Sequence, residues 1–113
     1  MLRIDDVGRY SAKTVYRHQL TQKGKTKTVF EERIVLFHAV NFEDAIAKAE
    51  TEANDHCTAV ENVVYLGFVS VYYLPEETVG DGTEIYSLMR DSDLSDTEYL
   101  ARFHDDGHER WLD

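Results

Sequence analysis

Five histidines are the residues of this chain whose chemistry is most versatile, because imidazole binds metals and exchanges protons near neutral pH. His104 and His108 lie four residues apart among acidic neighbours, so one helical face would present both rings to zinc. Gly107 between them argues against a continuous helix, and the neighbouring glutamate is not placed as in a His-Glu-x-x-His site. We therefore interpret residues 104–113 as a polar tail and predict no metal ligands.

The remaining candidates for catalysis have no partners at a characteristic spacing. Cys57 falls on the apolar stripe of a predicted helix, so we expect a small buried residue rather than a reactive thiol. His38 lies in an apolar strand, which favours a hydrogen-bonded interior imidazole over a general base. We predict no catalytic residues. Catalytic groups often converge only in three dimensions, so a pocket between helix and sheet near His38 and the tyrosines stays an alternative.

The acidic run from Asp91 to Glu98 resembles a calcium loop, but it fails at two positions. Asp96 stands at the sixth position, where the tight turn needs glycine, and Arg102 stands at the twelfth, where a bidentate glutamate belongs. A helix start explains the same residues, with Ser95 as the N-cap and Glu98 three residues later. Gly80-Asp81-Gly82 lacks the lysine and the spacing of a phosphate loop, so we predict no cofactor.

Charge is distributed unevenly along the chain. Residues 1–40 carry eight Lys and Arg against four Asp and Glu, a net of +4, whereas residues 41–113 carry four against eighteen, a net of −14. Three lysines, Lys23, Lys25 and Lys27, gather at one predicted turn, but no aromatic residue alternates with them and the acidic remainder would repel a nucleic acid. We therefore expect no nucleic-acid binding and interpret these lysines as a solvated turn, which could instead meet the acidic half of a second copy.

Composition indicates a folded, water-soluble protein. With 113 residues and 42% hydrophobic residues, we expect residues 1–113 to form a single domain, with a folded body at 9–103 and the tail at 104–113. One cysteine cannot form an internal disulfide, which indicates a reducing compartment. The first six residues contain no apolar stretch typical of a signal peptide, and no apolar run is long enough to cross a bilayer. We expect a cytoplasmic protein without membrane contact.

Hydrophobic periodicity predicts six elements. Alternation predicts strands near 9–21, 28–40, 62–74 and 84–90, and a 3.6-residue period predicts helices near 42–57 and 95–104. Gly24 marks a hairpin turn, Asn41 an N-cap, and the second strand is apolar on both faces, as expected of a central strand. The predicted fold is α+β, in the order β-β-α-β-β-α, with a four-stranded antiparallel sheet, one long helix across a face and a short C-terminal helix. The predicted core contains Ile34, Leu36, Ile46, Ala49, Val69 and Val71.

Four stretches of the chain resemble a known family. They are FEERIVLFHA at 30–39, FEDAIAKAE at 42–50, FVSVY at 68–72 and DGTEIYS at 81–87. The pattern of a strand that runs into an "EDAxxKA" helix is similar to that of a family of small bacterial proteins catalogued only as a domain of unknown function. The resemblance covers roughly residues 9–103. It rests on core, cap and turn residues and implies neither catalytic residues nor an activity.

These observations favour a module that works by protein–protein contact. Our hypothesis is an acidic protein-binding module, such as an inhibitor or immunity-type protein that blocks a basic nucleic-acid-binding partner or a nuclease. The residues expected to contact the partner are Asp91, Asp93, Asp96, Glu98, Asp105 and Asp106. The alternatives are a homodimer with a structural or regulatory role, and a ligand-binding domain or enzyme with the pocket described above. In the homodimer, a second copy covers the sheet face that the long helix leaves open.

Overall fold

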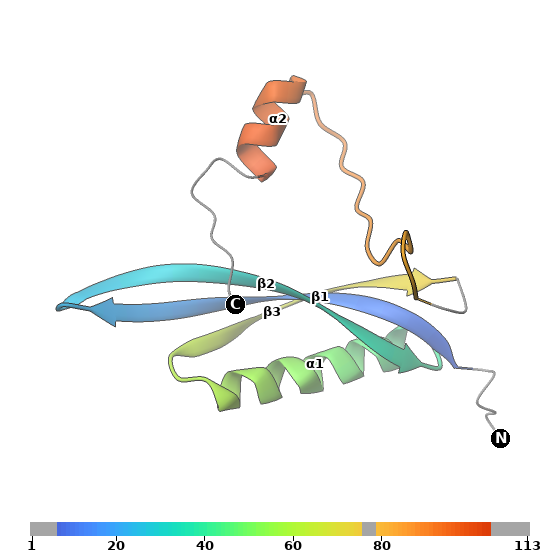
Figure 1. Cartoon of the computed structure of the whole chain (residues 1–113), viewed down its shortest axis with the longest axis horizontal. Helices are drawn as coiled ribbons and strands as arrows, with labels where there is room; N and C mark the ends of the chain where they lie inside the picture. The colour runs from blue at the N-terminus through green and yellow to red at the C-terminus, as the bar shows by residue number, and fades with distance from the viewer. Residues whose placement is uncertain (1–6, 76–78, 105–113) are drawn as a thin grey trace.

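A computed structural model describes residues 7–75 and 79–104, and in these residues it contains three strands and two helices. Their order along the chain is β1 (Gly8–Gln22), β2 (Lys25–Ala39), α1 (Phe42–Ala59), β3 (Val63–Leu74) and α2 (Asp96–Phe103). The three strands form one antiparallel sheet, with α1 on one side and α2 on the other (Figure 1). The predicted α+β class is confirmed.

A two-residue turn fixes the register of the β1–β2 hairpin. Lys23 and Gly24 both have positive φ, at 53° and 77°, as type I′ hairpin turns require. The pairing runs without interruption from Gln22 opposite Lys25 to Gly8 opposite Ala39. The predicted turn at Gly24 is therefore confirmed, and it decides which side chains share a face of the sheet.

The first strand lies at the centre of the sheet, because the strand order is β2-β1-β3. The sequence predicted instead that the second strand is central, since its residues are apolar on both faces. That prediction is wrong: β2 forms an edge, and its two apolar faces lie against α1 on one side and toward solvent on the other. The β1–β3 register shifts between the pairs Thr14–Val69 and Tyr16–Tyr65. The bulge that this leaves in β3 includes Gly67, whose φ is +77°.

The predicted fourth strand, at 84–90, is not a strand. This segment lies across the sheet face opposite α1 and meets it through side chains: the Ser11 hydroxyl donates to the Ile85 carbonyl, and the Tyr86 hydroxyl to Ser70 Oγ at 3.0 Å. The strand beneath it, β1, already has partners along both edges, so no backbone groups remain there for a further ladder.

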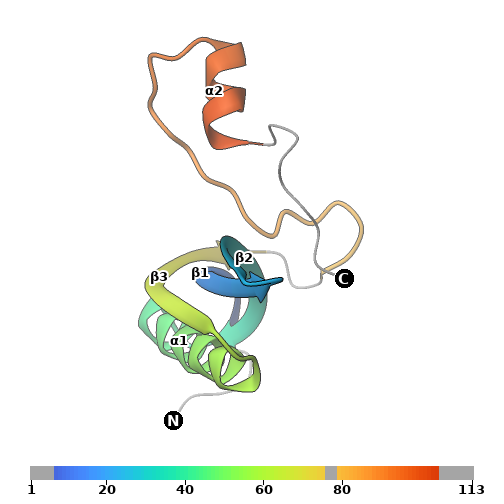
Figure 2. The same cartoon turned by 90° about the vertical axis from the view of Figure 1, so that its left-hand side faces the viewer.

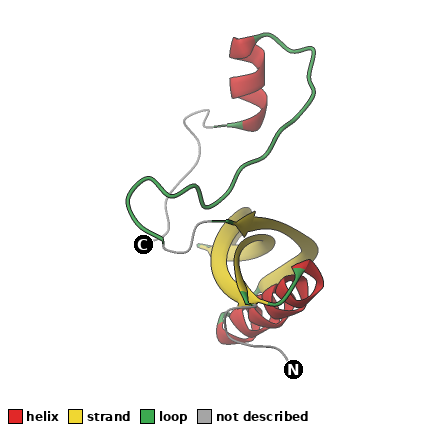
Figure 3. Ribbon diagram, turned by 90° about the vertical axis from the view of Figure 1, so that its right-hand side faces the viewer, coloured by secondary structure: helices red, strands yellow, loops and turns green. Residues whose placement is uncertain are grey.

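The long helix α1 begins as the sequence predicts. The Asn41 side chain accepts a hydrogen bond from the Asp44 amide at 2.8 Å, and the Asp44 carboxylate accepts one from the Val40 amide at 3.0 Å. The helix lies across one face of the sheet, as Figures 2 and 3 show from two directions. Its alanine stripe, Ala45, Ala49 and Ala53, is completely buried, which lets the helix backbone approach the sheet closely.

The hydrophobic core lies between α1 and the sheet, and its large members are tyrosines of β1. Tyr10 packs with Ala39 and Ala45, and Tyr16 packs with Ala53 and Val63. Of the six predicted core residues, Ala49 is buried, while Ile46, Val69 and Val71 are only half-buried. The prediction is wrong for Ile34 and Leu36, which are each 45% exposed. The hairpin register places both on the sheet face that α1 does not cover.

Candidate functional site

Two histidines and a glutamate meet where β1, β2 and α1 come together. The Glu31 carboxylate of β2 accepts hydrogen bonds at the same oxygen from His18 Nε2 of β1, at 2.8 Å, and from His56 Nε2 of α1, at 3.1 Å. The side chains of His18 and Glu31 are 15% exposed and that of His56 is 21% exposed. The His56 ring also packs edge-on against Tyr16, with ring centroids 4.8 Å apart.

Burial and the two imidazoles act in opposite directions on the pKa of Glu31. Burial raises it, but the hydrogen bonds and charges of His18 and His56 outweigh this effect, so the pKa lies below its usual value. Both Nε2 atoms donate to the carboxylate, which leaves the Nδ1 atom of each ring as its other hydrogen-bonding group. The cluster ties β1, β2 and α1 together.

A second polar cluster lies beside the first. Arg33 Nη1 donates to the Glu52 carboxylate at 2.7 Å and to the Tyr16 hydroxyl at 3.3 Å, while the Tyr16 and Thr14 hydroxyls lie 2.6 Å apart. The Tyr65 hydroxyl donates a hydrogen bond to the Glu50 carboxylate. Burial, and to a smaller extent this carboxylate, raise the pKa of Tyr65 to about 12. These polar groups are hydrogen-bonded within the protein, as buried polar groups must be to avoid a large desolvation cost.

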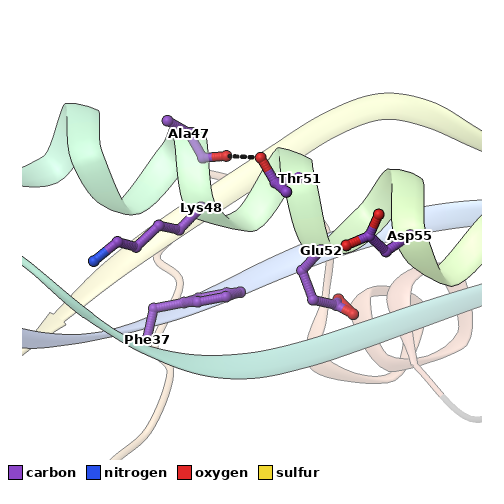
Figure 4. Close-up of a pocket in the computed structure, with 6 residues that line it drawn as sticks. All are labelled: Phe37, Ala47, Lys48, Thr51, Glu52 and Asp55. Carbon is purple, nitrogen blue, oxygen red and sulfur yellow. Dashed lines mark hydrogen bonds between the residues drawn. The ribbon is translucent and has the colours of Figure 1, made fainter.

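A shallow groove of about 400 Å³ runs between α1 and β2 (Figure 4). Its lining residues are Phe37, Ala47, Lys48, Thr51, Glu52 and Asp55. The charged ends of two of them already have partners: Lys48 Nζ donates to the His38 carbonyl at 2.7 Å, and Glu52 pairs with Arg33. The groove therefore presents few unused polar groups that could orient a ligand.

The structure corrects the expectation for His38. The register places its side chain opposite Arg9 on the sheet face away from α1, where it is exposed rather than interior. It therefore cannot line a pocket between helix and sheet. Cys57 is half-buried against the cluster of Tyr16, Ala53 and Val63, close to the small buried residue that the sequence predicts.

The sheet face opposite α1, here called the open face, combines apolar and cationic side chains. Lys13 and Arg17 of β1 form its middle column, and Phe30, Ile34 and Leu36 of β2 lie beside them. The exposed fractions of these three apolar residues are 62%, 45% and 45%. On the other side of the column, Val64 of β3 pairs with Arg17 and is 46% exposed. Large apolar side chains gathered in one exposed area are typical of a contact surface.

Residues 88–104, here called the arm, rise from the open face and end in α2 (Figure 2). The arm exposes apolar side chains: Met89 is 96% exposed, Leu100 58% and Leu88 54%. None of the residues of α2 is buried. The Arg90 guanidinium lies over the Phe103 ring, 4.4 Å from its centroid, and donates to the Tyr99 hydroxyl at 3.1 Å.

Four of the six predicted partner-binding residues lie on the arm. Asp91 and Asp93 precede α2, Asp96 and Glu98 lie in its first turn, and all four are exposed. Asp105 and Asp106, like His108 and the rest of the predicted tail, lie outside the described residues. The predicted helix start is confirmed: Ser95 is the N-cap of α2, and its Oγ accepts a hydrogen bond from the Glu98 amide at 3.2 Å.

The described residues hold neither a cluster of metal ligands nor a membrane-spanning helix. Within 7–75 and 79–104, no group of three or more His, Cys, Asp or Glu side chains is arranged to hold a metal ion. In the same part of the chain, neither helix is long and apolar enough to cross a membrane.

The polar clusters between helix and sheet were not among the predicted sites. The signal was present in the turn, because a two-residue turn at Lys23 and Gly24 places Tyr16 opposite Glu31 and Thr14 opposite Arg33. The strands were predicted without a pairing register, so these polar side chains could not be placed on the core face. The contacts of α1 with them depend on where the helix crosses the sheet, which no local pattern indicates.

Comparison with known proteins identifies a family. No curated protein matches the chain, and no solved structure does either. The family described as "Domain of unknown function (DUF4288)" matches residues 9–87, a range that includes β1, β2, α1, β3 and the segment lying across the open face. The match ends where the arm begins. Because it covers well over half of the sequence, the chain belongs to the DUF4288 family.

Proposed function

We propose that this chain is a protein-binding module whose arm docks onto a basic and apolar protein surface. The observation that carries the proposal is the exposure of α2 and its neighbours: Leu88, Met89 and Leu100 are each more than half exposed. An isolated helix of eight residues is marginal in water, because nucleation is costly and few hydrogen bonds follow it. A helix of this kind gains stability when its apolar side chains enter a partner's groove.

The charges of the arm support a basic partner. The arm carries four exposed acidic side chains, Asp91, Asp93, Asp96 and Glu98, whereas the two arginines that accompany them stack on its own Phe103 ring. Exposed acids around an apolar patch steer a cationic surface toward it and raise the association rate. One specific form of the proposal is an inhibitor that covers the basic nucleic-acid-binding surface of a nuclease. A second form is assembly with another copy of the chain.

Site-specific photo-crosslinking in the native cell tests the proposal. A photoreactive residue at Leu100 or Met89 should give a defined protein adduct, and the same residue at Thr51, which is exposed on α1, is the matched control. Reversal of the four arm acids to lysine should abolish the adduct, and the association rate of the purified pair should fall steeply with salt. Absence of any adduct beyond that seen from Thr51 would overturn the proposal, as would an adduct that is indifferent to charge reversal.

A further inference from the structure

The open face and the arm of this chain have complementary chemistry. The register places three cations, Arg9, Lys13 and Arg17, on the open face, together with one acid, Glu32, which forms an ion pair with Lys13. The arm carries four exposed acids close to the apolar side chains of Leu100 and Phe103. Both surfaces thus expose apolar side chains, and their charges are of opposite sign.

Within one molecule, the two surfaces do not meet. Residues 84–87, just before the arm, contact the open face through Ile85 and Tyr86. Beyond them α2 stands away from the sheet (Figures 1 and 2), and a hollow of about 410 Å³ separates the two. Its lining includes Lys13 and Glu32 of the sheet and Tyr99 and Phe103 of α2.

We propose that the surface that receives the arm is the open face of a second copy, and that two chains exchange arms across a two-fold axis. The inference rests on the proposed function, since it names the partner of the same arm. In such an isologous dimer each copy gives its arm and receives one, so both exposed surfaces are covered at once. The acids Asp93 and Asp96 then approach Lys13 and Arg17 of the partner, and Leu100 and Phe103 cover Ile34 and Leu36 of the partner.

Charge exchange between variants tests this geometry. Lys13→Glu with Arg17→Glu reverses the face, and Asp93→Lys with Asp96→Lys reverses the arm. Sedimentation equilibrium should show a dimer for the wild type and at least tenfold weaker self-association for each variant alone. An equimolar mixture should restore the dimer, because each arm then meets a face of opposite charge. Circular dichroism melts establish that both variants fold.

Apolar substitutions supply the second part of the test. Leu100→Ser and Ile34→Ser should each weaken the dimer, while Val60→Ser is the matched control, since Val60 is 44% exposed at the end of α1. A monomer at all concentrations would overturn the inference, as would an arm that folds onto its own face. A dimer unaffected by arm reversal would also overturn it, because it would indicate sheet-to-sheet contact.

The two proposals can fail separately. If the chain is monomeric and Leu100 still crosslinks to a different protein, the dimer is excluded and the binding module stands. If Leu100 crosslinks to a second copy of the chain, both proposals stand. If it crosslinks to nothing, both fall.

Discussion

The two faces of the sheet use alternate residues of the same strands but bury them very differently. On the face toward α1, the tyrosines of β1 pack against three alanines, and Tyr16 is 0% exposed. On the open face, Phe30 and Ile34 keep 62% and 45% of their surface exposed beside lysine and arginine. Large aliphatic residues in β2 therefore do not mark the core of this chain. The core combines the tyrosines of β1, small residues of the helix and two aliphatic residues of β3, Val63 and Leu74.

The largest expected effect comes from breaking the covered face. Tyr16→Ala should lower the free energy of unfolding by about 3–5 kcal/mol, because it removes a fully buried ring. Ile34→Ala, on the open face, should cost less than about 1 kcal/mol in the same urea melts at low protein concentration. Equal costs for the two substitutions would contradict the difference between the faces.

The next effect concerns the close approach of α1. Ala53 is 0% exposed against Tyr16 and Val63, so Ala53→Leu should overpack the interface and destabilise the protein by about 1–3 kcal/mol. Ala47→Leu adds the same atoms on an exposed position of the same helix and should change stability by less than about 0.5 kcal/mol. Thermal melts of the two variants, compared side by side, measure the contrast. A tolerated leucine at position 53 would mean that the helix lies farther from the sheet.

A smaller effect depends on pH. The pKa of Glu31 is lower in the folded protein than in the unfolded chain, so its ionised form stabilises the fold above the unfolded value near 4.5, and this contribution is lost as pH falls through the folded value. Glu31→Gln should therefore cost about 1 kcal/mol near neutral pH, because two imidazole donors lose a charged acceptor. The gap to the wild type should narrow in acid. A constant gap between pH 7 and pH 3 would show that the carboxylate charge is irrelevant.

The smallest effect is spectroscopic. Burial and the Glu50 carboxylate raise the pKa of Tyr65 to about 12, so Tyr65 should ionise later than an ordinary tyrosine. The difference between ultraviolet titrations of the wild type and Tyr65→Phe isolates its signal. Glu50→Gln should move this pKa down toward 10 without unfolding the protein. No movement would show that burial alone sets the value.

Patterns among neighbouring residues predicted most of the helices and strands. The features that they did not predict depend on packing between distant parts of the chain. The hairpin turn at Gly24, the cap at Asn41 and the alanine stripe of α1 depend on neighbouring residues, so the sequence predicts them well. Which strand lies at the centre depends on where β3 pairs, up to 65 positions along the chain from Arg9 to Leu74. Residues 84–90 have the alternation of a strand, but the part that meets the sheet, 84–87, lies over a strand that is already paired on both sides.

The exposure of the candidate contact residues could not be predicted in the same way. Ile34 and Leu36 are residue types that usually lie in a core. Whether such a residue is buried or exposed depends on whether another layer covers its face of the sheet, and no layer covers these two. The acids of the arm were identified from charge alone, since exposed carboxylates need no packing partner. Predicting the Glu31 cluster would have required both the register of the hairpin and the position of α1 on the sheet.

The central place of β1 has a consequence for the order in which the protein forms. The hairpin β1–β2 closes through two residues and can form while the chain is still being synthesised, whereas β3 must emerge after α1 before it reaches the other edge of β1. During that interval β1 has an unpaired edge, and its tyrosines, which are buried in the finished fold, are still exposed. Unpaired edges of this kind attract strands of other chains. Slow translation between α1 and β3 should therefore increase aggregation, while the finished sheet hides that edge.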